Sequence, residues 1–305
     1  MLVFCVIKII EKLVRICYSL YGAGTVMNGE VSAEQARKIL DMLTKGEALE
    51  NVNTSLALRL VPLAEELDDE DLIERLLEHA LDVSQDEVEK GWADFEIMKL
   101  KNAPIEDFAE LSSQVENLVD GSSLSAAIMH HLGLLYLTQE NYNEAKLFTN
   151  RSLRLRESND DEMGIVYGLA LLEACCKREN LNDEAIIHGT RRLEILMKLG
   201  DLEGQIEAMS DLAHTQATIG SFDAAQDLYN QSLTLSNELE DVSGQLVARW
   251  GLADIAEISE DYQTAMLLLS DCLHSFIALG IPAPPQVRDR IEALTNLEQP
   301  LGNKE

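Results

Sequence analysis

Aromatic residues make up only 5% of this 305-residue chain, and glycine and proline are also scarce, at 17 and 6 residues. β-Sandwiches and barrels need strands rich in aromatic and β-branched residues, joined by many glycine- and proline-containing turns, so the composition argues against both. The composition therefore predicts a helical protein, long enough for one large domain or two of ordinary size.

Positive charge is also scarce, because 24 lysines and arginines stand against 54 aspartates and glutamates and give a net charge of −30. Nucleic-acid phosphates and anionic membrane surfaces both attract basic faces, so the charge argues against either partner. Two explanations for the acidity stay open. One is solubility or adaptation to a salty cytoplasm, and the other is an acidic surface for a basic partner.

The cysteines lack any pairing pattern. Their number is odd and no C-x-x-C spacing occurs among Cys5, Cys17, Cys175, Cys176 and Cys272. We expect reduced thiols that pack as small hydrophobic residues, and hence a cytoplasmic protein.

The common catalytic and cofactor motifs are missing as well. The sequence contains no H-E-x-x-H, no Cys/His cluster at zinc spacing and no nucleophile elbow, and no glycine loop follows a predicted strand. His130 and His131 are adjacent, so they lie about 100° apart on a helix and are poorly placed for a shared metal. We expect one of the two histidines to face a groove and the other to be packed between helices. We predict no catalytic residues, no metal, no cofactor and no enzyme activity.

Residues 1–26 are apolar but contain three cations, Lys8, Lys12 and Arg15, against Glu11. Their charge of +2 leaves −32 on the rest of the chain, because the total is −30. The charges interrupt the run too often for a membrane span and come too late for a signal peptide. We favour a start at Met27, with residues 1–26 an over-extended gene start. An amphipathic anchor or partner-binding helix and an export signal remain alternatives. We expect no membrane contact except through this segment.

The strongest signal is an internal 40-residue repeat. Five columns keep this spacing without an insertion: Ala145, Ala185, Ala225 and Ala265; Leu153, Leu193, Leu233 and Leu273; Leu132, Leu172, Leu212 and Leu252; Asp161, Asp201 and Asp241; and Gly164, Gly204 and Gly244. Each unit fits two helices, which we call helix A and helix B.

In the third unit, Gly200 and Asp201 predict a helix end followed by an N-cap, and Gly220 predicts the break between helices over 202–218 and 223–238. The spacing predicts further helix pairs over 122–159, 162–199 and 242–279. We interpret the alanine column as the site where helices A and B cross closely, since a larger side chain there would push them apart.

The flanks of the repeats are less regular. Residues 27–121 predict degenerate helical repeats, with a helix over 31–45 and pairs over 51–82 and 85–119. Pro62 is expected to kink or split the first helix of the former pair, and Pro104 to lie in the first turn of the last helix. After four repeats over 122–280, residues 281–298 predict a capping helix and residues 299–305 a disordered tail.

Leu132-Gly133-x-x-Tyr136 followed by Tyr142-x-x-Ala145 resembles the tetratricopeptide repeat family. The small residue that the family places seven positions after the alanine is Ser152, Ser232 or Cys272, but Arg192 departs from it. Glu173, Ala213 and Ala253 replace the glycine, and Glu173 fits worst. The 40-residue spacing is similar to the extended-helix variant of rapsyn-like and mitotic-orientation scaffolds and of some bacterial peptide sensors. The resemblance implies an all-α, right-handed superhelical solenoid of antiparallel helix pairs, with a concave groove that holds a peptide or helix of another protein.

The resemblance also indicates which helix A residues face the groove, namely those two before, two after, and five or six after the leucine column. The candidates for partner binding are His130, Leu134, Lys177, Arg178, His214, Trp250, Asp254 and Glu257. In the functional interpretation, Trp250 is an aromatic anchor and Lys177 and Arg178 form a carboxylate clamp. The alternative is a solvated inner face, on which the two cations only cap the helix dipole.

We therefore predict a non-catalytic scaffold or adaptor that binds a peptide or helix of another protein. The alternative is a peptide- or ligand-responsive regulator, in which the repeats sense and the N-terminal helices form the output. A homo-oligomer is compatible with both.

Overall fold

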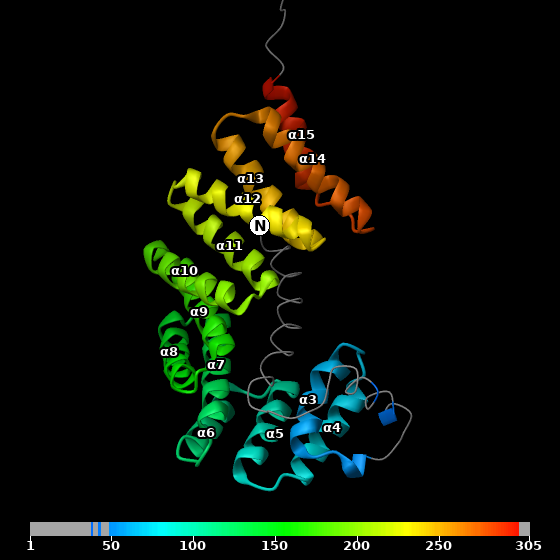
Figure 1. Ribbon diagram of the computed structural model, residues 1–305, viewed down its shortest axis with the longest axis vertical. Coiled ribbons are helices and arrows are strands. Elements are labelled where there is room, and N and C mark those ends of the chain that lie inside the picture. The colour runs from blue at the N-terminus through cyan, green and yellow to red at the C-terminus, as the bar shows by residue number, and fades with distance from the viewer. Residues whose placement is uncertain (1–37, 39–41, 44–48, 299–305) are drawn as a thin grey trace, which may run out of the picture. The chain divides into compact units, whose positions relative to one another are not determined.

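The computed structural model describes residue 38, residues 42–43 and residues 49–298 (Figure 1). Within these residues it contains thirteen bounded α-helices and no β-strand, which confirms the all-α prediction. None of the described helices has the length and hydropathy that a membrane span requires. The predictions for residues 1–26, for the tail at 299–305 and, apart from three positions, for the helix at 31–45 lie outside the described residues.

The chain forms two compact units that meet within one helix, after Leu171. The first unit contains a short 3-10 turn at Leu49–Asn51, then α3 (Thr54–Glu65), α4 (Glu70–Asp82), α5 (Glu87–Leu100), α6 (Ile105–Val115), α7 (Ser122–Thr138) and α8 (Tyr142–Ser158). The connecting helix is α9 (Glu162–Arg178). The second unit continues with α10 (Asn182–Leu199), α11 (Leu202–Thr218), α12 (Phe222–Glu238), α13 (Val242–Ile258), α14 (Tyr262–Ala278) and α15 (Pro285–Glu298).

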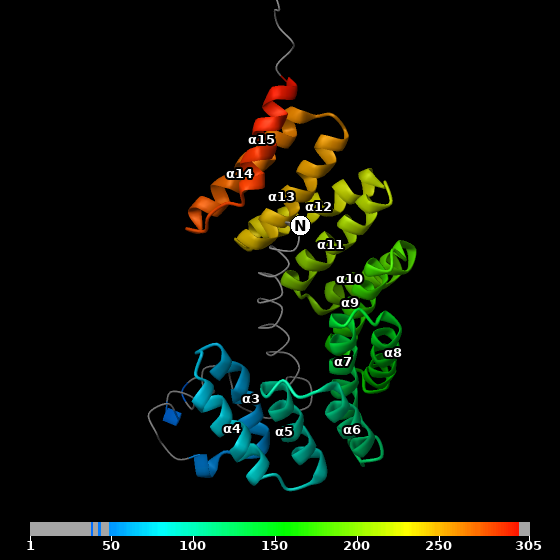
Figure 2. The ribbon, with the colours of Figure 1, turned by 180° about the vertical axis from the view of Figure 1, so that it is seen from behind.

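The repeat helices from α7 to α14 begin at even intervals of half a repeat, as the period read from the sequence predicts. Helix α11 has the predicted bounds, and α12 begins one residue before the predicted start. Asp201 caps α11 as expected, since its carboxylate accepts a hydrogen bond from the Gly204 amide at 3.0 Å. In the second unit, α11 to α15 follow one another as packed neighbours, which both views show (Figures 1 and 2). The domain limits at residues 121 and 280 remain predictions.

A residue with left-handed backbone follows each repeat helix from α7 to α14 within two residues, and another precedes α7. Nine such residues follow one another at intervals of 20, with φ between 52° and 81°: Asp120, Glu140, Asp160, Asn180, Gly200, Gly220, Glu240, Glu260 and Gly280. This conformation turns the chain sharply and allows the amides after the helix to satisfy its last carbonyl groups. The amide of Asp201, for example, donates to the carbonyl of Leu196 at 3.1 Å.

The alanine column is completely buried, since Ala145, Ala185, Ala225 and Ala265 are all 0% exposed. This agrees with the close helix crossing that the sequence predicts. In the first unit the degenerate region also packs as helix pairs. There α3 runs through Pro62 without a break, and Pro104 is the N-cap residue of α6.

Candidate functional site

Most of the predicted groove residues belong to the second unit and lie on its helix A elements, α9, α11 and α13. Lys177 of α9 binds Asp211 of α11, and α11 packs directly against α13. Helix α15 continues this row, since it binds α13 through Arg290. We call the surface formed by α9 from Leu172 onward, α11, α13 and α15 the helix A face.

Three predicted residues, Trp250, Asp254 and Glu257, converge on Arg290. The Arg290 guanidinium lies over the Trp250 ring at 5.0 Å from its centroid. Its Nη2 donates to Asp254 Oδ1 at 2.6 Å, and its Nε donates to Glu257 Oε1 at 2.9 Å. Trp250 is half-buried, and the cation that covers its ring belongs to α15 of the same chain.

Arg290 was not among the candidates from the sequence. A signal was present, since Arg290 stands one full repeat after Trp250 and therefore occupies the same repeat position in α15. The proline-rich segment before α15 ends the visible repeat pattern and conceals the register of this helix in the sequence.

Lys177 is part of a partly buried charge cluster that joins α9, α10 and α11. Its Nζ lies 2.8 Å from Asp211 Oδ1, and Arg192 Nη1 lies 3.0 Å from Asp211 Oδ2. Arg192 Nη2 also pairs with Glu207 at 3.1 Å. Burial alone would raise the pKa of Asp211, but Lys177 and Arg192 lower it to about 2. The carboxylate is therefore ionised throughout the physiological range. Arg178, at the end of α9, is exposed.

The two strongest departures from the repeat pattern, Glu173 and Arg192, lie in this same cluster. Glu173 Oε2 is 3.7 Å from Arg192 Nη1, and its side chain is 2% exposed. Gly189 on α10 provides the space, since a Cβ there would lie 3.2 Å from the Glu173 carboxyl carbon. The other repeats have Thr149, Tyr229 and Leu269 at the position of Gly189. A large residue in α9 is thus matched by a glycine in α10.

His214 is exposed on α11, between charges of both neighbouring helices. Partial burial and the charge of Lys177 lower its pKa, while Asp211 and Asp254 act in the opposite direction. Asp254 occupies the same repeat position one unit later. The structure therefore brings Lys177, His214 and Asp254 onto one face.

The other two candidates belong to the first unit. Leu134 is half-exposed, but His130 is only 7% exposed, which differs from the accessible position expected of a groove residue. The reason is its repeat position, which faces the neighbouring helices, since Ser210 at the equivalent place is 8% exposed. Burial, Arg156 and His131 lower the pKa of His130 to about 3. His131 packs on the Phe108 ring at 4.6 Å, and both histidines are neutral at physiological pH.

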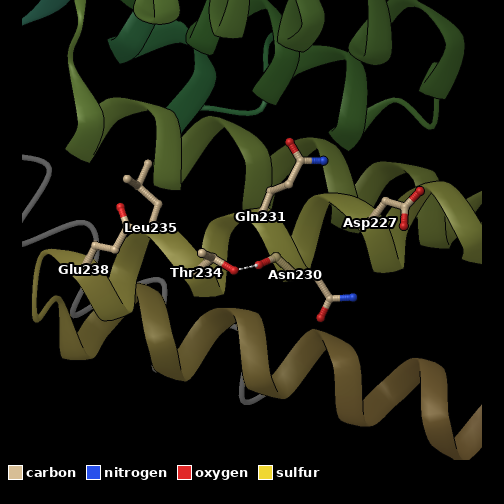
Figure 3. A pocket seen from close by; sticks show the side chains of 6 residues that line it. All are labelled: Asp227, Asn230, Gln231, Thr234, Leu235 and Glu238. Atoms are coloured by element: carbon tan, nitrogen blue, oxygen red, sulfur yellow. Dashed lines mark hydrogen bonds between the residues drawn. The ribbon is translucent and has the colours of Figure 1, made fainter.

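The helix B side of the second unit has a shallow hollow of about 430 Å³. All its lining side chains come from α12, as Figure 3 shows: Asp227, Asn230, Gln231, Thr234, Leu235 and Glu238. Thr234 Oγ1 donates to the backbone oxygen of Asn230 at 2.8 Å. Since the hollow is open and formed by one helix, it offers no converging groups for a small ligand. No group of three or more metal-ligating side chains occurs in the described part of the chain.

Comparisons with known proteins agree with this geometry. Residues 126–159, which include most of α7 and all of α8, match the family model of the tetratricopeptide repeat. No curated protein sequence matches the chain. The match confirms the resemblance read from Leu132, Gly133 and Ala145.

Several solved structures share the fold. A signal transduction ATPase with numerous domains (STAND) and a tetratricopeptide repeat sensor, from Pyrococcus horikoshii, has a TM-score of 0.63 and 17% identity. The alignment covers 86% of this chain but only 39% of that protein, so this chain spans well under half its length. The apo form of RapI has a TM-score of 0.62 and 13% identity, over 95% of this chain and 81% of RapI. A Rap protein complexed with Competence and Sporulation Factor has a TM-score of 0.55 and 13% identity, over 80% and 70% of the two chains.

At these identities the likenesses establish the fold. The chain is a helical repeat protein built from antiparallel helix pairs. One of its helix pairs, within residues 126–159, matches the tetratricopeptide repeat.

Proposed function

We propose that the chain is a non-catalytic interaction scaffold that holds an extended peptide or a helix of another protein on the helix A face. One observation carries the proposal. Exposed side chains of different chemistry recur on adjacent A helices, with Arg178 on α9, His214 on α11, and Asp254 and Ile258 on α13.

These side chains suit a peptide better than a small molecule. Ile258 is 58% exposed and offers an apolar contact. Arg178 is exposed, and the Asp254 side chain stays 51% exposed beside its ion pair with Arg290, so charges of both signs reach the surface. Neighbouring A helices present equivalent positions at regular intervals, so an extended backbone can be contacted at several points. The helices that carry the side chains are packed before binding, which keeps the entropic cost of association low.

A display library of random peptides, selected on the full-length chain, tests the proposal. We expect the selected peptides to bind His214→Ala and Ile258→Ser at least tenfold more weakly than the parent chain. Both residues are exposed, so the substitutions leave the packing intact. Asp227→Asn on α12 is the control, because its side chain lies in the hollow on helix B. Peptides that bind both helix A variants as tightly as the parent would overturn the assignment.

A regulator that responds to a peptide is the second candidate. It is favoured by the comparisons, since one similar protein has a tetratricopeptide repeat sensor and another was solved in complex with Competence and Sporulation Factor. In this candidate the helices α3 to α6 would form the output. X-ray scattering with and without a selected peptide separates the candidates, because a rigid scaffold keeps its profile and a responsive array changes it.

A further inference from the structure

The partly buried charge cluster has a composition that peptide binding does not require. It consists of Glu173 and the four charged groups that act on it. These are Lys177 on α9, Arg192 on α10, and Glu207 and Asp211 on α11. Three carboxylates thus face two cations. When all five are ionised, the cluster has one negative charge in excess. The Glu173 and Arg192 side chains are buried, at 2% and 5% exposure, while those of Asp211 and Glu207 reach solvent, at 37% and 50%.

Both cations bind Asp211 in preference to Glu173. Lys177 Nζ lies 2.8 Å from Asp211 Oδ1 but 3.8 Å from Glu173 Oε1. Arg192 Nη1 lies 3.0 Å from Asp211 Oδ2 but 3.7 Å from Glu173 Oε2. The Glu173 carboxylate is therefore outside hydrogen-bond distance of the two groups that could neutralise it.

Glu173 is also the most buried member of the cluster, at 2% exposure, and neither of its oxygens has a hydrogen-bond partner among the described residues. A carboxylate in such a place is costly when ionised and much less so when protonated. Burial and the charge of Asp211 raise the pKa of Glu173 to about 7.

We propose that Glu173 takes up a proton from solvent in the neutral pH range and thereby makes the packing of α10 against α9 and α11 depend on pH. With Glu173 protonated, two cations face two carboxylates and the cluster is balanced. When Glu173 loses the proton, its charge repels Asp211 and competes with it for Lys177 and Arg192. The seam then loosens as pH rises.

The direction follows from proton linkage. Between pH 4.5 and about 7 the folded chain holds a proton on Glu173 that the unfolded chain has released. The folding equilibrium constant therefore falls as pH rises through this window, by up to about tenfold per pH unit, and levels off above it. Asp211 has no effect there, because its folded and unfolded forms are both ionised.

Denaturation of the full-length chain between pH 5 and 8 tests the proposal. Relative to Glu173→Gln, which keeps the shape and cannot ionise, we expect the parent chain to lose stability from pH 5 to 7 and then to stay constant. Glu194→Gln on α10 removes an exposed carboxylate and is the matched control, so its curve should parallel the parent. The proposal is overturned when the curves of Glu173→Gln and the parent run parallel.

A second measurement observes the proton itself. With ¹³C-labelled glutamate carboxyl groups, the resonance that is missing from the Glu173→Gln spectrum should titrate near pH 7. A midpoint near pH 4 would contradict the proposal. Glu173→Ala, which copies Ala213 and Ala253 of the later repeats, provides the same assignment if the glutamine variant does not fold.

Discussion

The guanidinium of Arg290 covers the indole of Trp250 at 5.0 Å and binds the two carboxylates next to it on α13. Trp250 is therefore an internal contact of the second unit as well as a candidate anchor for a partner. A partner that uses the whole Trp250 ring has to compete with α15.

Arg290→Ala should lower the free energy of unfolding of the second unit by about 1–2 kcal/mol, since it removes charge-assisted hydrogen bonds and a cation–π contact at a partly exposed site. Amide hydrogen exchange should accelerate most in α15. Arg288→Ala, at an exposed position of the same helix, should change stability by less than about 0.5 kcal/mol. Equal effects of the two variants would show that the contact with α13 contributes nothing.

Arg192→Ser should cost about 1–3 kcal/mol, because it removes the guanidinium that pairs with Asp211 and Glu207, whose side chains are 37% and 50% exposed. The double variant Arg192→Ser with Glu173→Ala recreates the pair Ala213 and Ser232 of the next repeat and should cost less than Arg192→Ser alone. Denaturation of the four chains of this cycle gives the coupling energy, which we expect to exceed about 1 kcal/mol. Additive effects would mean that the two departures from the repeat pattern are independent.

Gly251→Ala should lower the free energy of unfolding by about 1–3 kcal/mol, since the added Cβ would collide with the Tyr229 ring and the helices would have to separate. Gly168→Ala is the matched control, because its nearest neighbour is the flexible end of Leu153 at 3.2 Å. The gain in helix propensity should offset that contact. Thermal unfolding of both variants checks this, and a smaller loss for Gly251→Ala than for Gly168→Ala would refute the packing argument.

Gly220→Ala should lower the free energy of unfolding by about 1 kcal/mol, because its left-handed backbone is unfavourable for alanine. Its φ is 81°, and no atom lies within 4 Å of the new Cβ, so the cost comes from the backbone alone. Glu240→Gly should raise the free energy of unfolding by about 0.5–1 kcal/mol, because glycine adopts the φ of 56° found there without strain. The two effects have opposite signs, so shifts in the same direction in chemical denaturation would contradict this account of the helix ends.

The fold was predictable because its signals are local. Gly200, Asp201 and Gly220 mark the ends of α11 in the sequence, and the structure has the same bounds. Proline predicted the course of its helix less well than glycine and aspartate predicted the helix ends. Pro62 was expected to kink or split its helix, yet α3 runs through it to Glu65, since proline removes one backbone hydrogen bond of the helix and leaves the others.

The candidate site was less predictable because its contacts join distant residues. Glu173 and Arg192 were recognised as departures from the pattern, but their proximity depends on the packing of α9 against α10 and on the space left by Gly189. The position of Arg290 depends in the same way on where α15 packs after the proline-rich segment. The exposed or buried state of His130 also depends on neighbours that a single helix does not specify.

The evenly spaced left-handed residues have a consequence for how such a chain can change in length. Every helix end from Asp120 to Gly280 has the same backbone conformation, so a block of one whole repeat begins and ends with equivalent joints. Tandem duplication of such a block, for example residues 201–240, needs no new turn. An insertion of a few residues inside a helix would instead rotate all later side chains out of register. The chain can therefore grow or shorten by whole repeats far more easily than by single residues.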